Sequence, residues 1–151
     1  MIKHFTATAI LVTDTQPRKV LLGLHQKLLM WLPPGGHMEE NENPMEALQR
    51  EVKEETGWDA TDYIPKSRML DERVTALPVP DYVFEEPIPS RSDKPEHIHI
   101  DFVYVIEVPE FIPQFPEREY ASMKWIGEAD VAGLPLYPNI KDIILPRCFS
   151  R

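Results

Sequence analysis

The chain is poor in cysteine and has no long apolar run. Cys148 is the one cysteine among 151 residues, so no disulfide can form within the chain, and a lone thiol suits a reducing compartment. No stretch approaches the roughly 18 uninterrupted apolar residues that a membrane span requires. We therefore expect a cytoplasmic protein that works without a membrane.

Positive charge is also scarce. The chain has 16 Lys and Arg against 25 Asp and Glu, a net charge of −9. Nucleic acid backbones are bound by a surplus of Lys and Arg, so this balance disfavours a large nucleic acid as partner. A small phosphorylated ligand stays open if a bound metal ion supplies positive charge locally. The length predicts one domain over residues 1–151, able to bury around 70% of its unfolded surface.

What the chain does have is an unusual spacing of glycine, acidic and basic residues. Gly36 is followed by Glu42 and then by the run Arg50-Glu51-Val52-Lys53-Glu54-Glu55-Thr56-Gly57-Trp58. The pattern is G-x5-E-x7-R-E-U-x-E-E-x-G-U, with U a bulky apolar residue. At average residue usage, it should match by chance on the order of once in a billion windows. The spacing therefore indicates a specific site.

Local signals predict a helix over residues 44–56. Asn43 precedes a proline, which disfavours helical backbone at that residue and suits an N-cap. Pro44 fits the first helical position, where its missing N–H costs nothing. Glu46 stands where a capping-box side chain reaches back, and Gly57 can adopt the positive φ that ends a helix.

The predicted helix carries its carboxylates on one side. Glu51 and Glu55 are one turn apart and Glu54 lies between their bearings, so the three side chains crowd together. Their repulsion requires a cation, and Arg50 on the flank can neutralise one of them. A bound metal ion would relieve the rest. The plain alternative is a solvated Glu-rich helix face, which the full spacing disfavours. A neighbouring apolar stripe should dock on a sheet: Met45, Leu48 and Val52.

The segment resembles the signature box of the Nudix hydrolases. The preceding residues 33–37, Pro-Pro-Gly-Gly-His, are similar to that family's turn between strand and helix. Trp58 is a mild departure, because the last position is usually aliphatic. Glu119, six residues before Trp125, resembles the acidic residue that precedes the last strand of many relatives. The resemblance covers nearly the whole chain and implies an α/β/α sandwich with a mixed sheet.

The resemblance also implies roles for individual residues. Glu51, Glu54 and Glu55 resemble the glutamates that hold Mg²⁺, for which Mn²⁺ is a possible substitute, and the carbonyl of Gly36 is a further ligand candidate. Arg50 resembles the arginine that orients these carboxylates. The general base comes either from the box or from a later loop in relatives, so Glu54 and Glu119 both stay open. Glu42 is expected to support the start of the helix or a metal-bound water.

Several ring side chains are candidates for substrate binding. His97 and His99 alternate along a predicted strand, so both imidazoles share one face. They could contact a phosphate or a base, form a satisfied structural pair, or hold zinc. Zinc is disfavoured, because two ligands do not make a zinc site and the sequence nearby offers no cysteine and no third histidine. Trp31 and Tyr104 could stack on a nucleobase, although aromatic residues on such strands more often belong to the core.

The remaining pattern predicts a mixed sheet with helices on both sides. Expected strands cover residues 4–13, 20–24, 31–32, 67–77, 97–108 and 119–126, and a C-terminal helix starts at Pro138. Prolines at positions 78, 80, 87, 89 and 95 predict a loop over residues 78–96. We interpret that loop as a flap or a partner contact.

The resemblance implies a Mg²⁺-dependent pyrophosphohydrolase that cleaves a nucleoside diphosphate linked to another group. Nucleoside triphosphates, ADP-ribose-like nucleotide sugars and dinucleoside polyphosphates compete as substrates, and the sequence does not choose among them. The alternative is a non-catalytic nucleotide sensor on the same fold, although the acidic positions of the box are intact. Relatives often pair, so a homodimer stays open.

Overall fold

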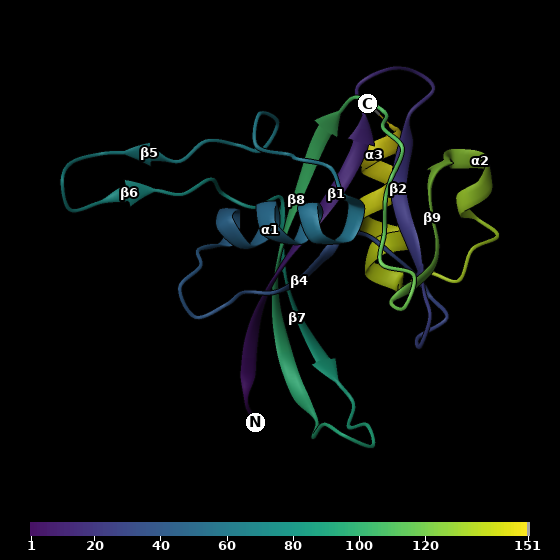
Figure 1. Cartoon of the computed structure of the whole chain (residues 1–151), viewed down its shortest axis with the longest axis horizontal. Coiled ribbons are helices and arrows are strands. Elements are labelled where there is room, and N and C mark those ends of the chain that lie inside the picture. The colour runs from purple at the N-terminus through teal and green to yellow at the C-terminus, as the bar shows by residue number, and fades with distance from the viewer. Residues whose placement is uncertain (151) are drawn as a thin grey trace.

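A computed structural model of the chain describes residues 1–150 (Figure 1). One large sheet, a small hairpin and short helices make up the structure. The elements in chain order are β1 (Lys3–Thr13), β2 (Lys19–His25), β3 (Trp31–Leu32), β4 (Gly35–His37), α1 (Pro44–Thr56), β5 (Arg68–Met69), β6 (Thr75–Ala76), β7 (Tyr82–Ile88), β8 (His97–Val108), β9 (Tyr120–Gly127), α2 (Glu128–Val131), the π-helical turn η1 (Asn139–Ile144) and α3 (Leu145–Phe149).

The large sheet has seven strands in a mixed arrangement. Its main path is β3-β2-β1-β8-β7, while β4 pairs with β1 and β9 pairs with β2. β1 and β8 run parallel in a register that joins His4 to His99 and Thr13 to Val108. The other pairs are antiparallel. The predicted mixed sheet is confirmed.

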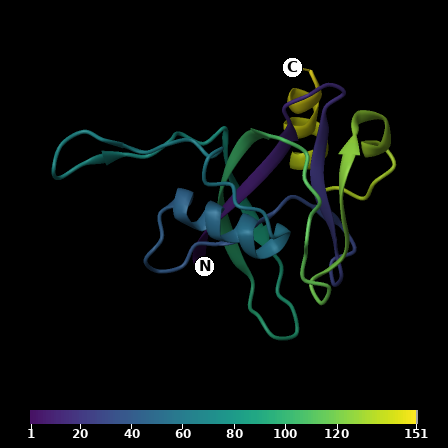
Figure 2. The same cartoon turned by 45° about the horizontal axis from the view of Figure 1, so that its top comes forward.

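The alternation along β1 separates two cores, one on each face of the sheet. Ala7 and Leu11 belong to a cluster with Leu48 and Val52 of α1, so the apolar stripe of the box helix docks as expected. Ile10 belongs to the other cluster, which contains the buried side chains of η1 and α3. α1 and the C-terminal helical segment thus cover opposite faces (Figure 1), as the turned view also shows (Figure 2). The predicted α/β/α sandwich is confirmed.

The loop predicted for residues 78–96 is partly wrong, because residues 82–88 form β7. β7 is the last strand on its path and pairs only with β8 among the named strands. Pro87 is tolerated there because an edge strand leaves alternate N–H groups without a partner strand. Tyr82 and Phe84 pack against the core under η1 and α3, which gives the strand an apolar face to bury.

Two other elements differ from the predicted pattern. The strand expected over residues 67–77 is a hairpin of β5 and β6, which projects from the body of the molecule (Figure 1). Asp71 makes the turn, because its carboxylate accepts hydrogen bonds from the N–H groups of Arg73 at 2.7 Å and Val74 at 3.0 Å. The C-terminal helix starts near Pro138 as expected, but Ile143 points to solvent while Ile140 and Ile144 are buried.

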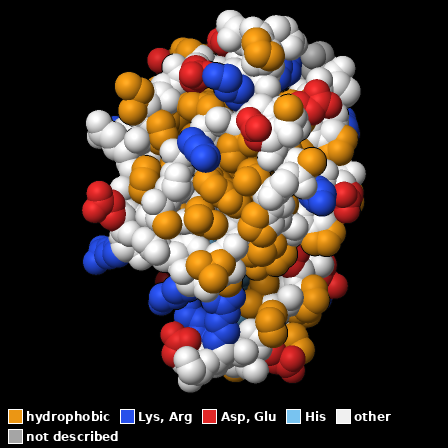
Figure 3. Space-filling model, turned by 90° about the vertical axis from the view of Figure 1, so that its right-hand side faces the viewer, with side chains coloured by type: hydrophobic (Ala, Val, Ile, Leu, Met, Phe, Trp, Pro, Cys, Tyr) orange, Lys and Arg blue, Asp and Glu red, His pale blue; other side chains and the backbone are white. Residues whose placement is uncertain are grey.

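No helix within residues 1–150 is both long enough and apolar enough to span a bilayer. On the side of the molecule that carries α2 and β9, apolar side chains form a broad patch between scattered charged groups (Figure 3). The homodimer stays a prediction.

Candidate active site

The box helix α1 begins and ends at the residues that the sequence indicated. The Asn43 side chain accepts a hydrogen bond from the Glu46 N–H at 2.9 Å, and the Glu46 carboxylate accepts from the Asn43 N–H at 3.0 Å. This is a complete capping box. Gly57 ends the helix with φ of 75°, in the left-handed region. These caps fix the rotation of the carboxylates relative to β4.

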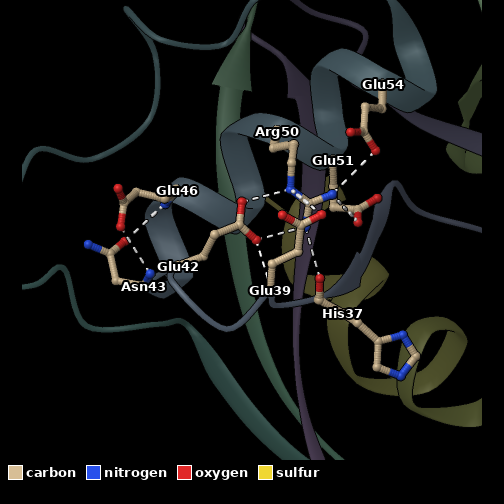
Figure 4. A network of polar contacts seen from close by, with 8 residues as sticks. All are labelled: His37, Glu39, Glu42, Asn43, Glu46, Arg50, Glu51 and Glu54. Carbon is tan, nitrogen blue, oxygen red and sulfur yellow. Dashed lines mark hydrogen bonds and ion pairs between the residues drawn. The ribbon is translucent and has the colours of Figure 1, made fainter.

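Arg50 is the centre of the polar network at the start of α1 (Figure 4). Its guanidinium donates to both oxygens of Glu42, at 2.7 and 2.8 Å, and to Glu51 at 2.8 Å. It also donates to the His37 carbonyl at 3.0 Å and to Glu54 at 3.3 Å. Hydrogen bonds with Glu42, followed by those with Glu51, raise the pKa of Arg50, and the same contact lowers the pKa of Glu42. One cation thus positions carboxylates from the loop and from α1.

Gly36 provides the close approach between β4 and the helix. A Cβ atom at this position would lie 2.6 Å from Oε1 of Glu51, so any side chain would displace that carboxylate. The missing side chain therefore places the Gly36 backbone directly against Glu51. Burial raises the pKa of Glu51, although the contact with Arg50 opposes that shift. Glu54 and Glu119 add repulsion in the same direction.

Glu55 is the most deeply placed carboxylate of the box, with 3% of the residue exposed. It accepts a hydrogen bond from the Gly35 N–H at 2.7 Å and a short one from the Tyr120 hydroxyl. Burial raises the pKa of Glu55 to about 8, despite these two donors. Without a neighbouring cation, the carboxyl is therefore largely protonated at neutral pH.

Glu54 and Glu119 are the accessible carboxylates of the site. The Glu54 side chain is 60% exposed, and among residues 1–150 its ion pair is with Arg50. Glu119 is exposed and directly precedes β9. Its charge adds to the raised pKa values of both Glu51 and Glu55, so it lies close enough to act on these two carboxyl groups. The structure thus brings together both of the acidic residues considered as general base.

The donor set of this site fits a hard divalent cation. Glu51, Glu54 and Glu55 offer carboxylate oxygens, the Gly36 backbone lies against Glu51, and Arg50 supplies the basic side chain that the described residues contribute to the network. Oxygen ligands of this kind suit Mg²⁺ and Mn²⁺. Burial, and to a smaller extent repulsion between the carboxylates, raises the pKa values of Glu51 and Glu55, and a bound cation would oppose both effects by stabilising the charged forms.

His97 and His99 lie in a cluster that the sequence did not predict. The Nε2 atoms of these two side chains are 3.1 Å apart, and the imidazoles of His4 and His37 complete a group of four. Burial, then the neighbouring imidazoles, lowers the pKa of His99 to about 4. The Asp101 carboxylate, two residues after His99 on β8, accepts hydrogen bonds from Thr6 and Thr8.

The two aromatic residues considered for base stacking lie in the cores. Trp31 is 7% exposed and belongs to the cluster under η1 and α3, with the Lys124 ammonium over its ring. Tyr104 is 2% exposed in the cluster under α1, and its hydroxyl donates to the Pro78 carbonyl at 3.1 Å. Both side chains are buried, so neither ring presents an accessible face for a base in this structure. The stacking role therefore stays a prediction from the sequence.

An α/β/α fold with a carboxylate-bearing helix against a glycine turn defines the structural class of this chain. Within that class, the NUDIX domain matches residues 3–148. The chain therefore belongs to the NUDIX domain family, a family of hydrolases that act on phosphoric anhydrides.

Individual relatives agree with this assignment. A NUDIX family hydrolase from Clostridium perfringens is 29% identical with a TM-score of 0.75, covering 99% of this chain and 98% of that one. The dihydroneopterin triphosphate pyrophosphohydrolase of E. coli shares the fold at 17% identity and a TM-score of 0.69, with full coverage of both chains. A Mycobacterium tuberculosis protein with the provisional name 8-oxo-dGTP diphosphatase 3 is 26% identical over 110 residues, 72% of this chain. The matched part spans 42% of that relative's length.

The raised pKa of Glu55 predicts a pH-dependent effect of Glu55→Gln on stability in metal-free buffer. Because folding raises this pKa from 4.5 to about 8, the wild-type chain should lose stability as pH rises through that window. The glutamine variant cannot ionise, so its advantage in unfolding free energy should grow by a few kcal/mol and level off above about pH 8. Urea denaturation in EDTA across pH measures this difference. Glu128→Gln, an exposed change on α2, should give a flat difference, and parallel curves for Glu55→Gln would contradict the assignment.

Proposed function

We propose that this protein is a Mg²⁺-dependent pyrophosphohydrolase that cleaves the diphosphate linkage of a nucleoside diphosphate joined to another group. The observation that carries the proposal is the geometry of α1: three glutamates beside a glycine turn, with Arg50 holding two of them at hydrogen-bonding distance. Family membership supports the reaction class. The substrate and the metal are our inference from the site.

The chemistry needs charge neutralisation and a deprotonated water. Diphosphate oxygens already carry negative charge, so an attacking water is repelled unless a cation intervenes. Mg²⁺ supplies that charge and lowers the pKa of a bound water. We assign its ligands to Glu51, Glu54, Glu55 and the Gly36 carbonyl. Arg50 keeps the Glu51 and Glu54 carboxylates oriented, which limits the reorganisation needed during the reaction.

The general base stays open between Glu54 and Glu119. Both side chains are accessible to water, whereas Glu55 already accepts hydrogen bonds from Gly35 and Tyr120. A hollow with a volume of about 430 Å³ lies beside the site at the edge of β4. It is lined by residues of β1, of β4 and of the loop that leads to Glu42. We propose this hollow as the place where a nucleotide-type substrate approaches.

Three substrate classes remain, namely nucleoside triphosphates, ADP-ribose-like nucleotide sugars and dinucleoside polyphosphates. The names of the E. coli and M. tuberculosis relatives point to triphosphates, a pterin nucleotide analogue in one case and an oxidised nucleotide in the other. At sequence identities of 17% and 26%, these names support only a general class of substrate, namely triphosphate compounds. We therefore place nucleoside triphosphate-like compounds first.

The test is a hydrolysis panel with all three classes, run with Mg²⁺ and with EDTA. Released phosphate is measured after treatment with inorganic pyrophosphatase, and the products are identified by chromatography. We expect cleavage of at least one class in Mg²⁺ and loss of that activity in EDTA. Cleavage that persists in EDTA would overturn the metal-dependent mechanism. Binding without cleavage would support the non-catalytic sensor instead.

A further inference from the structure

We propose that His4, His37, His97 and His99 form a second metal site, built from four imidazoles and suited to a divalent transition ion such as Zn²⁺. The site is distinct from the carboxylate ligands on α1 and takes a different class of metal, and two of its residues, His4 and His37, also line the hollow proposed for substrate approach. It brings together the N-terminal part of β1, the end of β4 and the start of β8, which are distant in the sequence.

The first argument is the distance between the ligand atoms. Each of the four side chains offers a ring nitrogen, and these nitrogens all lie within 4.8 Å of one another. A tetrahedral ion with Zn–N bonds of about 2.0 to 2.1 Å places its ligand atoms roughly 3.4 Å apart. The Nε2 atoms of His97 and His99 are already 3.1 Å apart. Small rotations of the other two rings would close the remaining gap.

The second argument is the orientation of His97. Its Nδ1 lies 3.0 Å from the Pro95 carbonyl, a group that can only accept a hydrogen bond. Nδ1 therefore carries the proton, and the free lone pair of the ring is on Nε2, the atom that faces His99. Metal-bound histidines typically donate their other N–H in this way, because the contact fixes both tautomer and ring orientation.

The third argument is that the strands deliver the four rings to one face of the sheet, away from the carboxylates. The register pairs His4 with His99 across β1 and β8, and His37 with Thr6 across β4 and β1. Gly36, one residue before His37, turns toward Glu51 on the opposite face. Figure 4 shows the same division, since the His37 carbonyl faces Arg50 while its imidazole points away from the glutamates.

The donor chemistry selects the metal. Four neutral nitrogens suit Zn²⁺, Co²⁺, Ni²⁺ or Cu²⁺, whereas Mg²⁺ prefers oxygen ligands. The plain alternative is a structural group of rings in tilted and edge-to-face contact, with ring centroids 4.8 to 5.3 Å apart for four of the pairs. That alternative accounts for the ring contacts and for one hydrogen bond between Nε2 atoms, but it does not require that one ring nitrogen from each of the four side chains lie within 4.8 Å of the others. Lys94 is the neighbouring positive charge that opposes a cation, and it lies exposed in a turn.

Titration with Co²⁺ tests the site directly, because a tetrahedral nitrogen site absorbs much more strongly in the visible range than an octahedral oxygen site. We expect an intense tetrahedral spectrum that saturates at one equivalent and is displaced by Zn²⁺. Zn²⁺ should also raise the melting temperature of the protein. In the double variant His97→Asn with His99→Asn, we expect both signals to disappear. The single variant His4→Asn, at an exposed position near the start of β1 and outside both core clusters, should weaken Zn²⁺ binding at least tenfold.

The fifth histidine of the chain provides a matched control. His25 lies on β2 outside the cluster, and its Nδ1 accepts hydrogen bonds from the Lys27 and Leu28 N–H groups at 3.2 Å. His25→Asn preserves an acceptor there and should bind Co²⁺ as the wild type does. Glu51→Gln with Glu54→Gln should also retain the tetrahedral spectrum, so the result is independent of the proposed hydrolysis. An octahedral spectrum in the wild type, or Zn²⁺ affinity unchanged in His4→Asn, would overturn the proposal.

Discussion

Replacing Glu54 by Gln is expected to lower kcat by about a hundredfold or more while leaving the fold intact. Changes in groups that merely support a metal ligand typically cost 10- to 100-fold, so loss of a ligand charge should reach at least the upper end. Glutamine has nearly the same volume as glutamate. The Glu54 side chain is 60% exposed, and its contact with Arg50 is a single ion pair at 3.3 Å. The unfolding free energy should therefore change by no more than about 0.5 kcal/mol.

The measurement is kcat and the Mg²⁺ concentration for half-maximal rate, on whichever substrate the panel identifies. Glu128→Gln removes the same charge from the exposed α2 and should leave both values unchanged. Glu119→Gln separates the remaining roles: a general base should change the pH profile of kcat without changing the requirement for Mg²⁺. An unchanged rate in Glu54→Gln would show that this carboxylate is neither a ligand nor the base.

The box helix was predictable because its signals are local. Asn43 and Pro44 determine where α1 begins, Gly57 determines where it ends, and each acts through its own backbone preference or an adjacent hydrogen bond. Once both ends are fixed, the helical repeat places Glu51, Glu54 and Glu55 without any knowledge of the rest of the fold. The structure adds the contacts made by the carboxylate-bearing side of α1, above all the two hydrogen bonds that Arg50 donates to Glu42.

The features that sequence reasoning missed depend on pairing between distant segments. The prolines of residues 78–96 predict a loop, and only the position of β7 at the edge of the sheet makes Pro87 acceptable in a strand. The histidine cluster depends on the parallel register of β1 with β8. This register places His4 beside His99, although the two residues are far apart in the sequence. Two signals were present in the sequence: His4 starts the first strand, and His37 ends the glycine turn. Neither indicates a site until the strand order is known.

Glu55 illustrates a third kind of limit. The sequence places it on the carboxylate face, but its burial and the Tyr120 hydroxyl come from packing against β9. Burial raises the pKa of Glu55 to about 8, although the hydrogen bond from Tyr120 opposes that shift, so that one ligand candidate must lose a proton before it can bind a cation strongly. Spacing alone treats the three glutamates as equivalent, whereas the fold gives each a different environment.

Arg50→Ala is expected to lower both activity and stability, because the Arg50 guanidinium donates hydrogen bonds to several carboxylates at once. Glu42 loses two hydrogen bonds of 2.7 and 2.8 Å, and Glu51 loses one of 2.8 Å. The side chains of Glu42 and Glu51 are each 14% exposed, so neither charge can be fully hydrated in place of Arg50. We expect the unfolding free energy to fall by about 2 kcal/mol, between the values for exposed and fully buried pairs, and kcat to fall at least tenfold.

The control for stability is Arg73→Ala, since Arg73 forms an ion pair with Asp71 on the exposed hairpin and should contribute no more than about 0.5 kcal/mol. Arg50→Lys separates charge from shape, because lysine preserves the positive charge but cannot contact both oxygens of Glu42 and also Glu51. If Arg50 acts by positioning, Arg50→Lys should regain much of the stability while the Mg²⁺ concentration for half-maximal rate stays raised. Full recovery of both values in Arg50→Lys would show that a positive charge alone is sufficient at this position.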